Sequence, residues 1–306
     1  MVGEVTTALF YLAAKPFPNC RVNLTWLGLD DSQKHSNFGR IYVSTLTEPK
    51  AGEKLSESEA KAYVDYLYAT LYKYAHEKIY KGVFMTQLRE GKLPLPVMRQ
   101  FFKNWGHFSL EVNALNAVSY YTHLPFFVRH FDLLGPFCAK IADELISPRA
   151  PGHVLVLLQT AEKMGLNKRE MLEEPYLPAA RAINDFCHKI FIDGSIVELW
   201  GLHVFEESLS MWSGQWFTAL TTHYGFSKAD AIYFSTHEEA DMDTHKLGEG
   251  GEEAMGHGAF NRTVLTRALQ ESIEFRAGYS MEYCALTMVD LHAQMKQAAL
   301  DNPYYP

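Results

Sequence analysis

The chain has no run of about 20 apolar residues, so nothing in it predicts a membrane-spanning helix. The short apolar stretch at residues 8–14 lacks the basic leader and the small-residue cleavage pattern of a signal peptide. Lys and Arg are not clustered, and the formal net charge is -8. Because phosphate groups are bound by clustered positive charge, these absences disfavour a nucleic-acid or anionic-membrane surface. A globular protein that acts on a small molecule is the favoured interpretation.

Cysteine is also scarce. The four cysteines are Cys20, Cys138, Cys187 and Cys284, without a CxxC pair or a repeated spacing. This distribution predicts neither a zinc knuckle nor a dense disulfide framework, and it is typical of a reducing cytoplasm. With 306 residues, of which 47% are hydrophobic, the chain can form one large core or a compact domain with an extension.

Residues 1–55 differ in pattern from the rest and are interpreted as an N-terminal extension of uncertain structure, with β-favouring residues at 21–29 and 40–46. At Ser56 a capping-box pattern with Glu59 begins a run of apolar residues at helical spacing. Further helices are expected from after Pro96 to Tyr121 and over 126–145, 153–164, 176–191, 195–223, 227–246 and 261–298. The prediction is an all-α domain of about seven or eight helices over residues 56–306.

The segment with the most specific chemistry contains His237, Asp241 and His245, on the helix expected over 227–246. At about 100° per residue the three side chains lie along one helix face, and their Cα atoms span about 12 Å. Imidazole and carboxylate groups together are typical iron ligands. This span is long for one ion on a regular helix and favours either two metal ions or a locally bulged helix. The alternative is an acidic, solvated helix face on which the two histidines are incidental.

A two-metal site in a helical bundle also needs donors from facing helices. Glu144 ends one expected helix and His153 begins the next, although such a pair could instead be a surface group and a cap. Glu206 and Glu207 lie in a strongly apolar segment, where a buried carboxylate requires a partner or a metal. At least one of these two glutamates is expected to face solvent.

Four aromatic residues near these donors are candidates for the wall of a pocket, with the hydrophobic core as the alternative location. They are Trp212, Trp216, Tyr224 and Tyr233.

Two stretches of the sequence resemble a known family. The first is Leu220-Thr-Thr-His223-Tyr224-Gly225, and the second is Tyr233-Phe234-Ser-Thr-His237-Glu-Glu-Ala-Asp241 with a following histidine. They are similar to the heme-oxygenase-like diiron oxidases, relatives of the TenA and pyrroloquinoline-quinone synthase C proteins. The resemblance is strongest over residues 202–246 and extends more weakly from about residue 85 to the C-terminus. Residues 140–145 followed by His153 resemble the first Glu and His ligands of the family, and Glu206 falls at its second glutamate.

The resemblance implies a heme-oxygenase-like helical bundle, a homodimer, two non-heme irons and O2 as co-substrate. The implied ligands are Glu144, His153, Glu206, His237, Asp241 and His245, with Glu207 and Asp243 as alternates. The spacing departs from the family at the end of this set, because three residues precede His245 where two are usual. The implied reaction is oxidation of a small amine, amino acid or carboxylic acid in specialised metabolism, by N-oxygenation, desaturation or C–C cleavage.

Two other functions remain open from the sequence. A metal-free oxidase or a thiaminase-like enzyme on the same fold would use the same cavity for acid–base chemistry. A non-catalytic helical interaction protein would instead keep the charged groups as buried ion pairs. The shape of the cavity selects the substrate, and a linear pattern does not contain it.

Overall fold

The computed structural model describes residues 52–173, 177–240, 247, 255–273 and 279–301, and within these ranges it contains helices and no β-strand. The prediction of an all-α fold is therefore confirmed. The predicted boundary between extension and domain at residue 55 stays a prediction, since residues 1–51 lie outside the described ranges. Among the described helices, none combines the length and the apolar composition that crossing a bilayer requires.

The first described helix, α2 (Glu57–Tyr74), begins where the sequence predicts. The Ser56 side chain accepts a hydrogen bond from the Glu59 backbone N–H, and the Glu59 carboxylate accepts one from Ser56 in return. Each contact satisfies a backbone donor that the helix start would leave unpaired. The helix continues as a π-helical turn, η3 (Ala75–Tyr80), and is followed by the short α3 (Val83–Arg89).

Helix α4 (Leu95–Arg129) is longer than predicted, since it continues through Pro125, where the sequence suggested a gap. Phe126 and Phe127, which follow this proline, are buried in the core and keep this turn of the helix in place. The break falls later, at the 3-10 turn η4 (Phe131–Leu133), before α5 (Leu134–Ile146). Pro136 lies in the first turn of α5, where its missing N–H has no helical partner to lose.

The remaining helices are α6 (His153–Lys163), α7 (Lys168–Glu173), α8 (Pro178–Asp193), α9 (Ile196–His223), α10 (Ile232–Ala240), α11 (His257–Glu271) and α12 (Tyr279–Asp301). The single helix predicted over 261–298 is wrong, because α11 ends and Ser272 is extended. Backbone hydrogen bonds between Ile273 and the chain at Gly52 and Glu53 account for this end. A contact so distant in sequence has no local signal.

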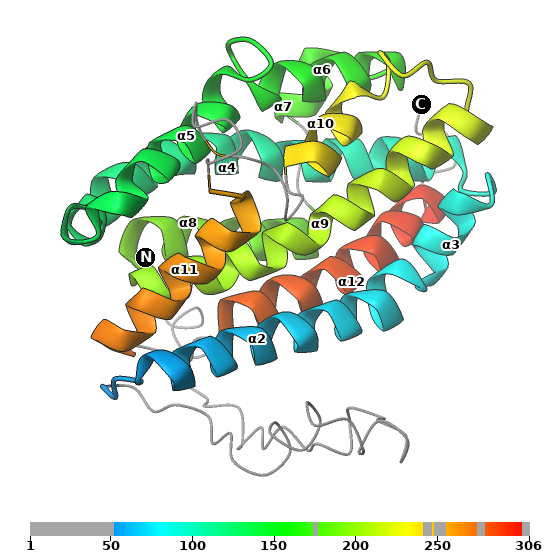
Figure 1. Ribbon diagram of the computed structural model, residues 1–306. Helices are drawn as coiled ribbons and strands as arrows, with labels where there is room; N and C mark the ends of the chain where they lie inside the picture. The colour runs from blue at the N-terminus through cyan, green and yellow to red at the C-terminus, as the bar shows by residue number, and fades with distance from the viewer. Residues whose placement is uncertain (1–51, 174–176, 241–246, 248–254, 274–278, 302–306) are drawn as a thin grey trace, which may run out of the picture. The chain divides into compact units, whose positions relative to one another are not determined.

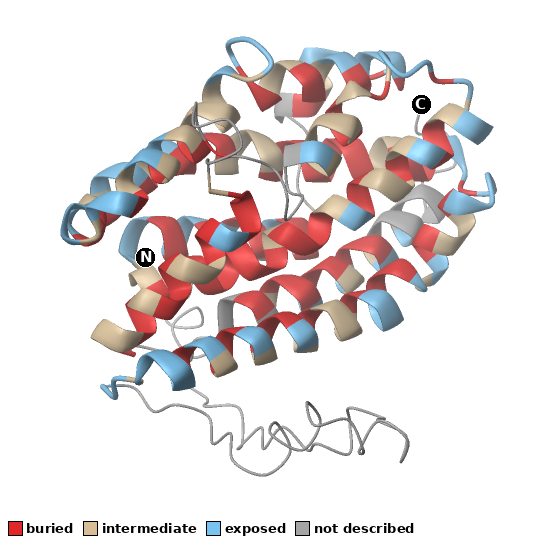
Figure 2. Ribbon diagram, viewed as in Figure 1, coloured by how far each residue is buried: buried red, intermediate tan, exposed pale blue. Residues whose placement is uncertain are grey.

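Helix α9 is the centre of the bundle, with α10, α11 and α12 packed against it (Figure 1). Every residue from Leu199 to Phe205 is buried, so α9 has no solvent face along this part (Figure 2). A helix that is apolar all round belongs in a core. A capping box between Ser195 and Glu198, like the one at the start of α2, fixes the start of α9 at the predicted position.

Candidate functional site

A cavity of about 60 Å³ lies between seven helices, α4, α5, α6, α8, α9, α10 and α12. Its polar wall consists of Ser109, Glu144, His153, His203, Glu206, Tyr233 and His237. The rest of the wall is Trp105, Phe108, Val112, Phe191, Leu202, Phe205, Leu209 and Cys284. Four of the predicted donors, which come from four different helices, thus line one cavity.

Glu144 and His153 are brought together by the turn between α5 and α6. Gly152 has a φ of 68°, and a Cβ built on it would lie 2.1 Å from the Glu144 carbonyl oxygen. This position therefore requires glycine. The turn places His153 Nδ1 2.9 Å from Glu144 Oε2, although eight residues separate the two in sequence.

Glu144 and His153 stabilise each other's charged form. Burial acts to raise the pKa of Glu144, but attraction to His153 and then to His237 outweighs it and holds the pKa at about 2. Burial acts to lower the pKa of His153, and its contact with Glu144 outweighs that effect and raises it. The carboxylate is thus charged at neutral pH, as a metal ligand must be.

His237 is held in one tautomer. Its Nδ1 donates a hydrogen bond of 2.8 Å to the carbonyl oxygen of Tyr233, one turn earlier on α10. Nε2 therefore keeps its lone pair, the arrangement typical of metal-binding histidines. Burial and the nearby His153 lower the pKa of His237 to about 4, so the ring is neutral at pH 7. The ring centroids of His153 and His237 are 4.5 Å apart.

Glu206 has two partners that the sequence reasoning missed. Lys140 Nζ lies 3.0 Å from Glu206 Oε2, and His203 Nδ1 contacts the same oxygen. Burial acts to raise the pKa of Glu206, but Lys140 and then His203 lower it well below its usual range. Lys140 Nζ also lies 2.9 Å from Nε2 of His257 on α11. The sequence signals were the four-residue spacing of Lys140 from Glu144 and the three-residue spacing of His203 from Glu206.

The expectation that Glu206 or Glu207 faces solvent is wrong. Glu207 is 1% exposed, and it accepts hydrogen bonds from Tyr68 of α2 and from Asn261 of α11. Because α9 is covered on opposite sides, adjacent glutamates both point inward. Glu207 is not part of the cavity wall.

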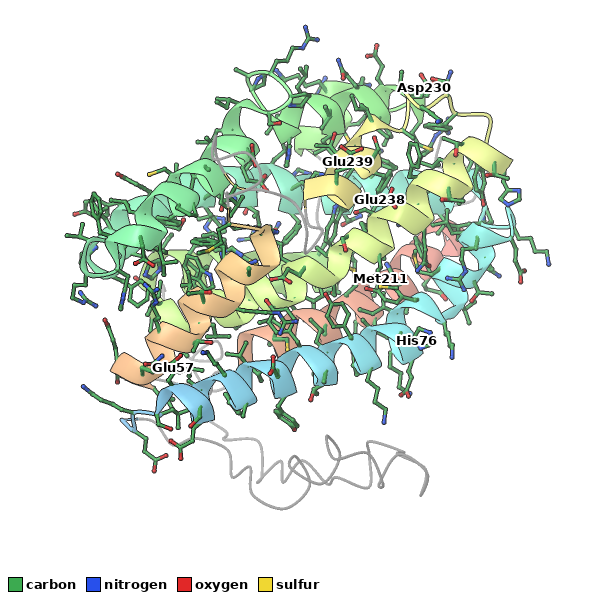
Figure 3. The ribbon with its side chains drawn as sticks, viewed as in Figure 1. Glu57, His76, Met211, Asp230, Glu238 and Glu239 are labelled. Atoms are coloured by element: carbon green, nitrogen blue, oxygen red, sulfur yellow. The ribbon has the colours of Figure 1, made fainter. Side chains whose placement is uncertain are left out.

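Helix α10 separates its histidine from its acidic residues. His237 lines the cavity, whereas Glu239 is exposed. Glu238 is half-buried, and its carboxylate lies close to Gly214 of α9. Figure 3 labels Glu238 and Glu239 next to each other on α10. The acidic face of the alternative interpretation exists, but His237 does not belong to it. Asp241, Asp243 and His245 lie outside the described residues.

Of the four aromatic candidates, Tyr233 lines the cavity. Its hydroxyl accepts a hydrogen bond of 2.9 Å from Trp105 Nε1 and lies 2.7 Å from the Ser109 hydroxyl. Trp212 and Trp216 belong to the aromatic core, and the Tyr224 hydroxyl bonds to the backbone of Leu93. These three are not part of the wall. Trp105 and Ser109, on α4, were missed because α4 gave no donor pattern.

The donor set tests whether a metal centre fits. Glu144, His153 and His237 are of the right types, and His237 presents a free lone pair. At Glu206, the ammonium of Lys140 lies where a metal cation would compete for the same oxygen. Within the described ranges, no three His, Cys, Asp or Glu side chains are grouped closely enough to bind a metal by themselves. A centre would therefore need donors outside these ranges or a small movement of those within them.

No protein-family model matches the chain. Two solved structures share its architecture. A protein of unknown function with a heme-oxygenase-like fold, from Shewanella denitrificans, aligns with a TM-score of 0.54 at 12% identity over 82% of this chain and 97% of that one. A TenA homologue from Pseudomonas syringae aligns with a TM-score of 0.53 at 10% identity over 81% of this chain and 100% of that one. The chain therefore has a heme-oxygenase-like fold.

A curated relative, the 4-aminobenzoate synthase of Chlamydia pneumoniae, is 24% identical over 154 residues. The match covers 47% of this chain and 69% of the relative.

Proposed function

We propose that the chain is an O2-dependent non-heme diiron oxidase. The observation that supports this most is the convergence of Glu144, His153, Glu206 and His237, from four helices, on one cavity of a heme-oxygenase-like fold. Asp241 and His245, or Asp243 in place of His245, would complete the ligand set. Iron, when bound, would supply the activation of O2, because imidazole and carboxylate donors can leave open positions on the metal.

The chain's own residues would prepare this site in three ways. His153 and Glu144 hold each other in place, so both ligands are positioned, and His153 would release its proton when its ring binds a metal. The Tyr233 carbonyl fixes the orientation of the His237 ring. The apolar wall excludes bulk water, which strengthens electrostatic interactions inside the cavity.

The substrate would be a small amine, amino acid or carboxylic acid. Since one water occupies about 30 Å³, the cavity of about 60 Å³ has room for about two waters. An amino acid is larger, so we expect wall side chains such as Leu202 and Leu209 to move when substrate binds. The hydroxyls of Ser109 and Tyr233 are the groups best placed to orient a polar substrate atom.

The experiment that tests the proposal is anaerobic loading with Fe(II) followed by exposure to O2. A diiron site predicts rapid O2 uptake with a transient absorbance change, which is lost in His237→Ala. His188→Ala is the matched control, because His188 is an exposed histidine that pairs with Glu111 on the surface. No O2-dependent change in the loaded wild-type protein would refute the proposal.

A metal-free enzyme is the second candidate, and the contacts of Glu206 with Lys140 and His203 favour it. Buried pairs of this kind can hold or transfer a proton without a metal. Activity that persists after exhaustive chelation would support this candidate and exclude an obligatory iron centre. Homodimerisation and a cytoplasmic location stay predictions.

A further inference from the structure

A pair of buried thiols lies beside the cavity. Cys187 of α8 and Cys284 of α12 follow directly on Phe186 and Tyr283, whose rings stack with centroids 4.1 Å apart. Each cysteine is 1% exposed, neither is in a disulfide, and the Cys284 thiol is near enough to Cys187 to raise the pKa of its thiol. Two reduced thiols thus lie near each other where two packed helices meet.

The two cysteines differ in access. Cys284 forms part of the cavity wall together with Glu206 and His203, whereas Cys187 does not. The hydrogen bond to Cys284 and burial raise the pKa of the Cys187 thiol well above its usual value. Because burial shields both thiols from reagents in bulk solvent, the oxidants that reach the pair are small molecules in the cavity, which Cys284 lines.

We propose that Cys187 and Cys284 form a redox-active dithiol that hydrogen peroxide in the cavity oxidises to a disulfide. The Cys284 sulfur attacks one peroxide oxygen, the O–O bond breaks, and water leaves with the thiol proton. The Cys187 sulfur then displaces the remaining oxygen of the Cys284 sulfenic acid as a second water, and the S–S bond forms.

The reaction is balanced. One peroxide gains two electrons and becomes two waters, and the two thiols lose two electrons and two protons. The sulfur atoms must approach each other to the bonding distance of about 2 Å, and the packing of α8 on α12 keeps the two cysteines close enough for this approach. The pair would remove peroxide before it reaches the oxidisable wall residue Trp105, and a small thiol reductant would restore it. The proposal does not depend on iron, because peroxide is its only reactant.

The test uses the metal-free, full-length protein. It is treated with hydrogen peroxide, denatured in acid, alkylated with N-ethylmaleimide and digested with trypsin without reduction. We expect mass spectrometry to detect peptides 182–189 and 277–296 joined by a disulfide that dithiothreitol removes. In the folded protein, the bulky reagent 5,5′-dithiobis(2-nitrobenzoate) should modify the exposed Cys138 but leave Cys187 and Cys284 as thiols.

Two variants sharpen the test. Cys187→Ser should stop the reaction at the Cys284 sulfenic acid, which dimedone traps, while Cys138→Ser should form the same disulfide as the wild type. The proposal is overturned if peroxide oxidises Cys138 while Cys187 and Cys284 are recovered as alkylated thiols. Separate sulfinic acids on Cys187 and Cys284 would overturn it as well. The wild-type peptide map decides the question even if Cys187→Ser does not fold.

Discussion

Lys140 Nζ lies 3.0 Å from Glu206 Oε2, so an ammonium group neutralises a carboxylate at which the proposed function requires iron. Both side chains are largely buried, with 6% and 16% exposure. A buried carboxylate without a counter-charge would cost several kcal/mol, so Lys140 stabilises the metal-free fold at this point. It also repels an incoming cation. Lys140 therefore raises the stability of the metal-free protein and lowers the affinity of the site for a metal.

This balance predicts the effect of Lys140→Met. Without iron, the variant should lose about 3 kcal/mol or more of unfolding free energy, because Glu206 loses its main counter-charge. Its dissociation constant for Fe(II) should fall by about tenfold or more. The reason is that the variant loses the repulsion between the Lys140 ammonium and the metal cation, which at short range exceeds the roughly 1.4 kcal/mol that corresponds to a factor of ten. Urea denaturation and anaerobic metal titration measure the two effects. Lys163→Met, at a half-exposed lysine, should change neither, and weaker iron binding by Lys140→Met would contradict the account.

The turn at Gly152 predicts a second result. Gly152→Ala places a Cβ against the Glu144 carbonyl oxygen at a φ that suits glycine alone, so we expect a loss of about 1–3 kcal/mol or more. Moving His153 away from Glu144 should also weaken metal binding. Gly135→Ala is the matched control, because a Cβ there meets nothing within 4 Å. Equal stability and equal iron content in the two variants would show that the turn does not position the ligand pair.

Comparing Glu206 with its neighbour Glu207 tests which of the two glutamates binds iron. Glu207→Gln should keep its iron, because Glu207 bonds to Tyr68 and Asn261 outside the cavity wall. Glu206→Gln should lose iron from one position. Metal analysis after gel filtration separates the two variants. Loss of iron from Glu207→Gln alone, with an unchanged melting temperature, would instead identify Glu207 as the ligand.

His292 predicts the response to acid. Burial lowers its pKa to about 3, and its ring stacks on Phe84 at 4.2 Å. The unfolded chain takes up a proton at this residue near pH 6.5, whereas the folded protein does so only near pH 3. Between these values, His292 therefore lowers stability by about 1.4 kcal/mol for each pH unit of acidification. His292→Phe should flatten the dependence of unfolding free energy on pH from 6.5 down to 4. Urea denaturation at several pH values measures this slope, and a slope equal to that of the wild type would contradict the account.

Much of the fold could be predicted from local patterns. The capping boxes at Ser56 and Ser195 fix the starts of α2 and α9 because they use side chains three residues apart. The end of α11 could not be predicted, since it depends on pairing between Ile273 and the chain near Gly52. Local hydrogen bonds leave a sequence signal, whereas this long-range pairing leaves none.

In the candidate site, too, some residues could be predicted from local sequence patterns and others could not. Helical spacing pointed to His237, adjoining helix ends to Glu144 and His153, and apolar surroundings to Glu206. These four side chains do line one cavity. Lys140 could not be assigned to Glu206, because helical spacing predicts a shared face but not the partner across the cavity, whereas the three-residue spacing of His203 from Glu206 was a usable signal. Trp212 and Trp216 show the limit for aromatic residues, whose pattern is the same in a core as in a pocket wall.

The iron content of the protein tests the central claim most directly. Protein that is loaded anaerobically with Fe(II) and passed through a desalting column should hold about two irons per chain by mass spectrometric metal analysis. His237→Ala and Glu206→Ala should each hold about one or fewer, while His188→Ala holds the wild-type amount. Trace iron in the loaded wild-type protein, or equal iron in all four proteins, would contradict the proposed diiron centre.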